Sequence, residues 1–177
     1  MAGRVASLDI LSVVDVRGED AAAFLHAQLC GDILDLAEGR CRFTAWCTAR
    51  GRVVASFLLA RGVGGFRMIV PRDIAARFVQ KLRLYVLRSR VELVDHGDEL
   101  SVAGWFGAPA APPLPADDWE YVENGEVAAL ALPGSGGTRV LLAGPAHALA
   151  AHHPGEAHAS GWILEDVRTG MPWIGSP

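Results

Sequence analysis

The sequence predicts an α+β protein in which helices pack on mainly antiparallel sheets. Apolar residues repeat at three- and four-residue steps in the segments Glu19–Leu29 and Asp73–Leu87, which is the period of an amphipathic helix. The segments around them hold short apolar or alternating runs, and these are typical of strands. A chain of 177 residues, half of them apolar, can bury a core in one or two small domains.

The first half of the chain reads as strand, helix, three strands, helix and strand. Glu19 and Asp20 favour a helix start, and Gly31 is a candidate for the left-handed residue after its end. Asp73 is a suitable N-cap for the second helix. The apolar stripe expected on that helix consists of Ile74, Phe78, Leu82 and Tyr85. The expected strands are Leu11–Val16, Cys41–Thr48, Arg52–Ala60, Phe66–Val70 and Val91–Val94.

The pattern changes after residues 95–100, where we expect a domain boundary. Ala108–Pro115 contains four prolines and is expected to be a loop. We therefore expect an N-terminal α+β domain over residues 1–97 and a second, smaller and incomplete α+β unit over 98–177. The elements expected in the second unit are strands at Leu100–Trp105, Val127–Leu132 and Arg139–Ala143, and helices at Ala146–His152 and Trp162–Arg168.

Charge is distributed unequally between the two halves. Residues 1–94 hold 14 Lys and Arg against 9 Asp and Glu, whereas residues 95–177 hold 2 against 11, which gives the net charge of −4. A basic half is consistent with an anionic ligand, with a solvated surface, or with docking of the two halves. A basic strip made of Arg77, Lys81, Arg83, Arg88 and Arg90 is consistent with an anionic ligand or RNA, or with a solvated helix face.

Other sequence features predict a cytoplasmic protein without metal and without membrane segments. The apolar runs are too short to span a bilayer, and the N-terminus has no signal-peptide pattern. The three cysteines lack Cys-x-x-Cys spacing, so each is expected to be an inert thiol. The histidine cluster His147, His152, His153 and His158 is interrupted by Pro154, which disfavours a metal site.

Four segments carry the most specific pattern in the chain, and they are Gly18–Asp32, Ala45–Val54, Gly65–Asp73 and Lys81–Arg90. In this order and with these short gaps they closely resemble the N-terminal part of the YgfZ family. That family is related to the folate-binding T-protein of glycine cleavage. The similarity runs from about Leu8 to Arg90. It resumes at Trp162–Ile174, a segment that resembles the family's Arg-x-Gly-x-Pro-x-Ile pattern.

The resemblance implies a T-protein-like fold that binds tetrahydrofolate or a derivative in the central hole of a ring of domains. It also implies a role in the assembly or maintenance of iron–sulfur proteins. Folate is the expected ligand, and iron–sulfur proteins or tRNA are candidate partners of the basic N-terminal half. The residues expected at a weak folate-binding site are Trp46, Ser56, Val70, Arg72 and Arg168.

The chain also departs from these relatives. The T-protein carries paired aspartates where this sequence has Ala55 and Ser56, and a pterin-facing glutamate where it has Arg168. Arginine has no acceptor for the N–H groups of a pterin, so aminomethyl transfer is disfavoured and no catalytic residue is assigned. The family's Lys-Gly-Cys-Tyr-x-Gly-Gln-Glu motif is not in this sequence, so a fragment is expected. An aminomethyltransferase-like enzyme and a non-catalytic interaction module stay open as alternatives.

Overall fold

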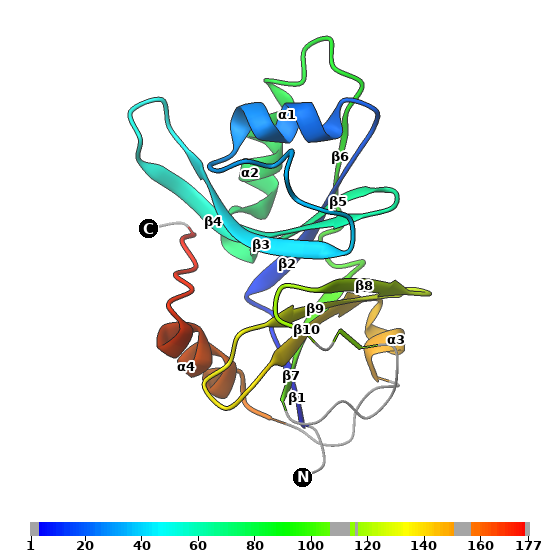
Figure 1. Ribbon diagram of the computed structural model, residues 1–177, viewed down its shortest axis with the longest axis vertical. Coiled ribbons are helices and arrows are strands. Elements are labelled where there is room, and N and C mark those ends of the chain that lie inside the picture. Colours follow the sequence, from blue (N-terminus) through cyan, green and yellow to red (C-terminus); the bar gives the residue numbers. More distant parts are fainter. Residues whose placement is uncertain (1–3, 107–113, 116, 151–156, 176–177) are drawn as a thin grey trace. The chain divides into compact units, whose positions relative to one another are not determined.

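The structure of the chain is a computed structural model that describes residues 4–106, 114–115, 117–150 and 157–175 (Figure 1). The chain divides into two compact units. Unit A consists of Ile10–Gly97 with Trp173–Pro177, and unit B consists of Met1–Asp9 with Asp98–Pro172. The chain passes from unit A to unit B after Gly97. The expected domains were 1–97 and 98–177. The division differs at the two ends of the chain, because Met1–Asp9 belongs to unit B and Trp173–Pro177 belongs to unit A.

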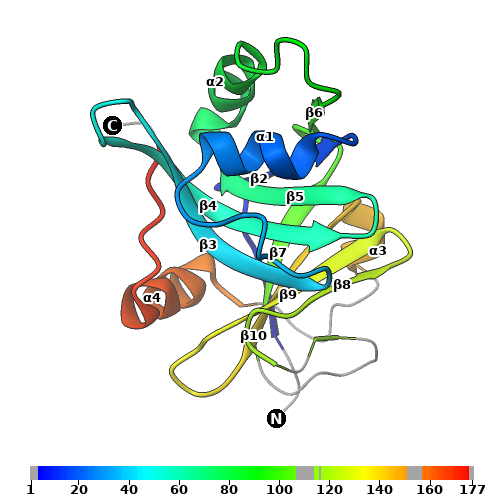
Figure 2. The ribbon, with the colours of Figure 1, turned by 45° about the horizontal axis from the view of Figure 1, so that its top comes forward.

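Unit A contains one antiparallel sheet whose strand order is β3-β4-β5-β2-β6. Two helices pack on it, and Figure 2 shows α1 lying beside β5. The bounds are β2 Leu11–Arg17, α1 Ala21–Gln28, β3 Arg40–Cys47, β4 Val53–Gly62, β5 Gly65–Pro71, α2 Arg72–Arg83 and β6 Glu92–Asp95.

The core of unit A lies between one face of this sheet and the two helices. Alternate strand residues point into it, as the period of two requires, and Phe57 is one of them. Its ring centroid lies 5.1 Å from that of Phe78 on α2. Helix α1 contributes Phe24 and Leu25, and both are buried. We call this the helix-covered face of unit A and the opposite one the helix-free face.

Helix α2 ends earlier than its apolar stripe predicted. Beyond Arg83 the chain makes turns with hydrogen bonds between residues three apart, such as that from Tyr85 N to the Leu82 carbonyl oxygen. This tighter winding ends the 3.6-residue period, so Tyr85 is 52% exposed instead of continuing the stripe. Leu87 has a φ of 47°, which is incompatible with a continuing α-helix.

Unit B holds a second antiparallel sheet with the order β1-β7-β10-β9-β8. Its first strand, β1, was not expected from the sequence and is paired with β7. The bounds are β1 Arg4–Ser7, β7 Ser101–Phe106, β8 Tyr121–Asn124, β9 Val127–Leu132, β10 Arg139–Gly144, α3 Ala146–Ala150 and α4 Ala159–Thr169.

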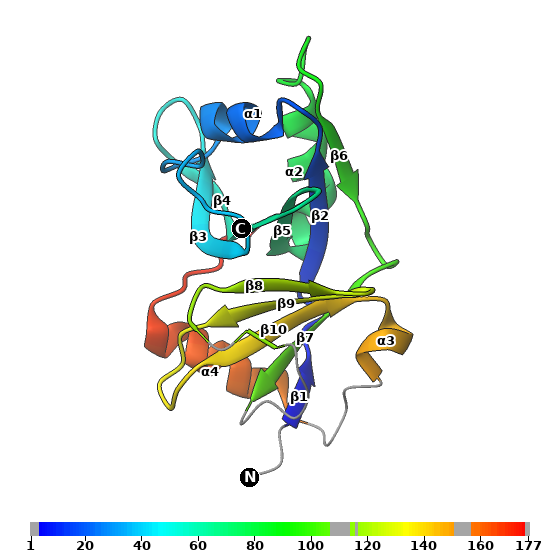
Figure 3. The same cartoon turned by 45° about the vertical axis from the view of Figure 1, so that its right-hand side comes forward.

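The two helices of unit B cover opposite faces of its sheet (Figure 3). Leu149 of α3 packs with Ala103 and Trp105 of β7, while the intervening Gly104 faces Trp162 of α4. A Cβ atom at Gly104 would overlap the indole ring, so this close approach requires glycine. The expected α+β class with antiparallel sheets is confirmed. In the described ranges no helix combines the length and apolar character needed to cross a membrane.

Candidate functional site

Two of the residues expected at a folate site, Trp46 and Val70, belong to the helix-covered face of unit A. Trp46 is 7% exposed, and its ring centroid lies 5.6 Å from that of Phe78 in an edge-on arrangement. Val70 on β5 is fully buried in the same cluster. Both side chains therefore contribute to the core beneath the helices.

Ser56 lies on the other face of the same sheet. Its neighbours Ala55 and Phe57 point into the helix-covered core, so the side chain between them points to the helix-free face. The Ser56 hydroxyl accepts a hydrogen bond of 2.7 Å from Ile174 N, and Ser56 N donates one of 3.2 Å to the Ile174 carbonyl oxygen. The segment that begins at Trp173 is thus held against β4.

The two expected arginines belong to different units. Arg72 opens α2 in unit A, where its backbone N–H donates to the Ile10 carbonyl oxygen at 2.8 Å and its side chain reaches the Gly97 carbonyl oxygen at 3.4 Å. Arg168 lies on α4 in unit B and forms an exposed ion pair with Glu165 at 2.9 Å. Within unit A, therefore, the structure groups Trp46 with Val70 and separates both from Ser56.

Glu165 is held by further donors besides Arg168. Ser135 donates to its carboxylate from the backbone N–H at 2.7 Å and from the hydroxyl at 2.8 Å. These bonds, with that of Arg168, lower the pKa of Glu165 to about 2. Arg168 therefore faces a carboxylate that remains ionised at neutral pH.

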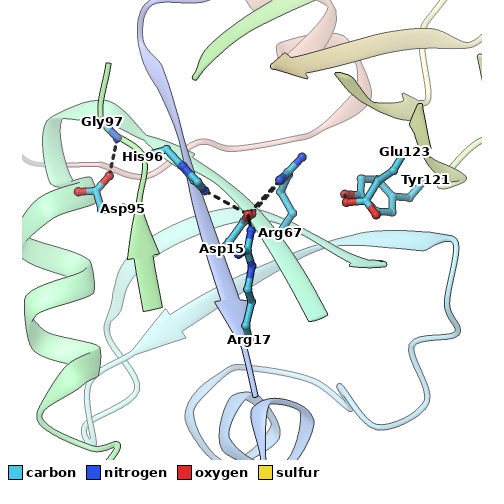
Figure 4. Close-up of polar contacts among 8 residues, drawn as sticks. All are labelled: Asp15, Arg17, Arg67, Asp95, His96, Gly97, Tyr121 and Glu123. Carbon is cyan, nitrogen blue, oxygen red and sulfur yellow. Dashed lines mark hydrogen bonds and ion pairs between the residues drawn. The ribbon is translucent and has the colours of Figure 1, made fainter. Parts of the chain in front are cut away.

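A charged cluster that the sequence reading did not assign lies on the helix-free face of unit A (Figure 4). Its centre is Asp15 on β2, whose side chain is only 5% exposed. Arg67 on β5 donates to both carboxylate oxygens, at 2.8 and 2.9 Å. Arg17 lies 3.0 Å from the carboxylate, and His96 Nε2 lies 3.1 Å from it. We call these four residues the Asp15 cluster.

The partners of Asp15 keep its carboxylate ionised despite burial. Burial raises the pKa of Asp15, but the hydrogen bonds and charges of Arg67 and His96 outweigh it, so the pKa lies below its ordinary value. The signal for this cluster was an aspartate inside the apolar strand Leu11–Val16, since a buried carboxylate needs donors. Sequence alone did not identify Arg67 and His96, because they are 52 and 81 residues away.

We expect Asp15→Asn to lower the free energy of unfolding by about 1–3 kcal/mol at pH 7, since it removes charge-assisted hydrogen bonds. A lowered folded-state pKa contributes stability above the unfolded pKa near 3.8, and that contribution is lost as pH falls. The difference between the two proteins should therefore shrink towards pH 3 in urea titrations. Asp35→Asn, in an exposed ion pair with Arg42, is the matched control and should change little. A difference independent of pH would contradict this account.

A cavity of about 550 Å³ opens in unit A where the ends of α1, β3 and α2 meet. Trp46 and Tyr85 both line it, and their ring centroids lie 6.5 Å apart. This volume is in the range of small-molecule sites. The remaining lining residues are Ala27, Gln28, Cys47, Thr48, Ala49, Val54, Lys81 and Leu84.

Members of the basic strip have separate roles. Lys81 lines the cavity, and Arg83 donates to the Leu93 carbonyl oxygen at 2.8 Å. Arg90 pairs with Glu19 at 2.5 Å. Arg83 and Arg90 thus make contacts within unit A.

The described part of the chain contains no group of three or more His, Cys, Asp or Glu side chains arranged for a metal ion. His147 lies 3.2 Å from Glu126 on the surface. Of the other members of the histidine cluster, His152 and His153 fall outside the described residues.

Comparison with solved structures defines the class of fold. The chain superposes on the glycine cleavage system aminomethyltransferase T from Bartonella henselae with a TM-score of 0.72 and 17% identity, covering 85% of this chain and 45% of that one. Heterotetrameric sarcosine oxidase from Corynebacterium sp. U-96 gives a TM-score of 0.53 and 12% identity, covering 98% of this chain and 88% of that one. The chain therefore has the fold of the aminomethyltransferase T-protein.

Sequence comparison gives the particular relatives. The tRNA-modifying protein YgfZ of Edwardsiella ictaluri is 28% identical over 182 residues, which cover 96% of this chain and 55% of that protein. The Escherichia coli K12 protein of the same name is 26% identical over 95% of this chain and 55% of its own length. No family model matches the chain. The resemblance to YgfZ proteins is confirmed, and this chain spans about half the length of these relatives.

Proposed function

We propose that this chain is a YgfZ-like protein that binds tetrahydrofolate or a derivative and takes part in the assembly or maintenance of iron–sulfur proteins. The observation that carries the proposal is similarity to YgfZ proteins over 96% of the chain, combined with the T-protein fold. Those relatives are named as tRNA-modifying proteins. We therefore propose that the iron–sulfur proteins that depend on this chain include enzymes that modify tRNA.

Within unit A, we propose that the helix-free face contributes to folate binding. Ser56 stands on that face at one of the two positions that match the aspartates of the T-protein, and the Asp15 cluster supplies polar groups there. Trp46 and Val70 would then have an indirect role. They pack in the core on the helix-covered face and hold the strands that carry the folate-binding residues in position. Arg72 is the proposed cationic contact of unit A for a carboxylate of folate. Arg168, which the resemblance also suggests, belongs to unit B and stays a separate prediction.

We expect 5-formyltetrahydrofolate to bind weakly at low salt and more weakly as salt rises, because an anion held by arginine is screened. Arg72→Ala should reduce the affinity about tenfold or more in calorimetry, since it removes a charge-assisted contact. Arg77→Ala is the matched control, because it removes the same charge from an exposed position of the same helix. Thermal unfolding of both variants shows whether they remain folded. The absence of binding heat and of a thermal shift for the unaltered chain would refute folate binding.

Aminomethyl transfer is the alternative from another class, favoured only by the T-protein fold. Ala55 and Ser56 supply no carboxylate. Asp15 does supply one on the helix-free face, but its hydrogen bonds to Arg67 and His96 and its lowered pKa make it a weak base. An assay for folate-dependent aminomethyl transfer should therefore be negative. A folded chain that gives neither folate binding nor transfer would favour the interaction module.

The cellular role is tested separately from binding. Deleting the gene for this chain should lower the activity of an iron–sulfur-dependent enzyme and the level of the tRNA modifications that such enzymes make. Unchanged activity and unchanged tRNA modification would refute the proposed role, even if folate binds.

A further inference from the structure

Two of the three cysteines meet at the edge of the unit A sheet, although 17 residues separate them. Cys30 Sγ and Cys47 Sγ lie 3.2 Å apart, and they share a hydrogen bond. Cys30 is exposed and Cys47 is half-buried, whereas Cys41 is buried. Each of the three was expected to be a buried or inert thiol, and the sequence did not predict that two of them are neighbours.

The backbone fixes Cys30 against β3. Leu29 forms an antiparallel bridge with Trp46, Cys30 N donates to the Ala45 carbonyl oxygen at 2.9 Å, and the Thr44 hydroxyl donates to the Cys30 carbonyl oxygen at 2.6 Å. The bridged residues Leu29 and Trp46 both point into the helix-covered core. Cys30 and Cys47 are the residues that follow this bridge in the two segments, and their sulfur atoms meet there.

A β-bulge lies beside the two cysteines, which are diagonal neighbours across the Leu29–Trp46 bridge. The pairing of β3 with β4 shifts register between Trp46 and Cys47, and such a bulge redirects the side chains beside it. The two sulfur atoms thus need to approach by only roughly 1 Å to reach the length of a disulfide bond, about 2.05 Å.

We propose that Cys30 and Cys47 form a reversible thiol–disulfide pair that reacts with low-molecular-weight disulfides of the glutathione class. The thiolate of Cys30, the more exposed partner, attacks one sulfur of the glutathione disulfide, and the first glutathione leaves as a thiolate that takes up a proton. The Cys47 thiolate then attacks the Cys30 sulfur of the mixed disulfide and releases the second glutathione. Two protein thiols are oxidised to one disulfide while one glutathione disulfide is reduced to two thiols.

A raised thiol pKa and the neighbouring cavity are the two features of the surroundings that bear on the pair. The hydrogen bond from Cys47 raises the pKa of Cys30, as does burial, so less of the attacking thiolate is present at neutral pH and exchange with a disulfide is faster at pH 8. Cys47 also lines the cavity of unit A. Oxidation would therefore tie the segment after α1 to the end of β3 at the cavity wall.

The test treats the full chain with glutathione disulfide at pH 8, blocks remaining thiols with iodoacetamide, and maps peptides without reduction. We expect a Cys30–Cys47 cross-link, complete reversal by dithiothreitol, and free Cys41, whose burial raises its pKa to about 12. The yield should not depend on protein concentration, because the bond forms within one chain. Cys41→Ser is the matched control and should give the same cross-link.

One variant and one change of conditions distinguish a paired dithiol from two independent surface thiols. Cys47→Ser should stop the reaction at a mixed disulfide of glutathione with Cys30. Unfolding the chain in guanidinium before oxidation should lower the ratio of cross-link to mixed disulfide about tenfold or more, because the folded backbone supplies the proximity. The proposal is overturned if folded chain accumulates mixed disulfides at both cysteines, if the cross-link forms only between chains, or if unfolding leaves the ratio unchanged.

Discussion

Replacing Asp166 by alanine is expected to lower the free energy of unfolding by about 3–5 kcal/mol, because it leaves a buried guanidinium without its charge partner. The Arg139 and Asp166 side chains are 3% and 7% exposed, and their closest N–O distance is 2.5 Å. Arg139 also stacks on Trp162, with its guanidinium carbon 4.3 Å from the ring centroid. Urea unfolding followed by tryptophan fluorescence measures the loss.

Two further variants test whether the large loss of stability in Asp166→Ala is due to burial of the ion pair. Arg168→Ala breaks an exposed ion pair on the same helix and should cost no more than about 1 kcal/mol. Combining Arg139→Met with Asp166→Leu should recover much of the lost stability, because no unpaired charge then stays buried. If Asp166→Ala were no worse than Arg168→Ala, the buried pair would not be the anchor of α4 on its sheet.

The sequence predicted the elements of this pair but not the pair itself. Arg139 was expected to begin a strand and Asp166 to lie on a helix, and both expectations agree with β10 and α4. Their meeting depends on how closely α4 approaches the sheet, which Gly104 permits by exposing its backbone to Trp162. Such an approach depends on packing between distant segments, and the local periodicity of apolar residues in the sequence does not predict it.

The residues of the candidate site likewise could not be placed relative to one another from the sequence alone. The resemblance suggested positions such as Ser56 and Arg72, but it could not tell which face of the sheet each side chain occupies. The face of Trp46 is decided by the core around Phe78. Likewise, Cys30 approaches Cys47 because an irregular segment after α1 covers the edge of β3, and irregular segments carry no periodic signal.

Local periodicity worked best for α2, where it predicted the buried residues Ile74, Phe78 and Leu82. It failed for Tyr85, because the helix gives way to tight turns beyond Arg83 and the apolar spacing no longer corresponds to one face. The distinction between a residue inside the helix and one just beyond it can be measured with two leucines.

Leu82→Ala is expected to lower the free energy of unfolding by about 2–5 kcal/mol, because the side chain is fully buried in the unit A core and its removal leaves a cavity. Leu84→Ala makes the same chemical change two residues later, at a side chain that is 72% exposed, and should change stability by no more than about 0.5 kcal/mol. Urea titrations of both variants and the unaltered chain provide the comparison. Equal effects of the two substitutions would mean that α2 presents a different face to the sheet.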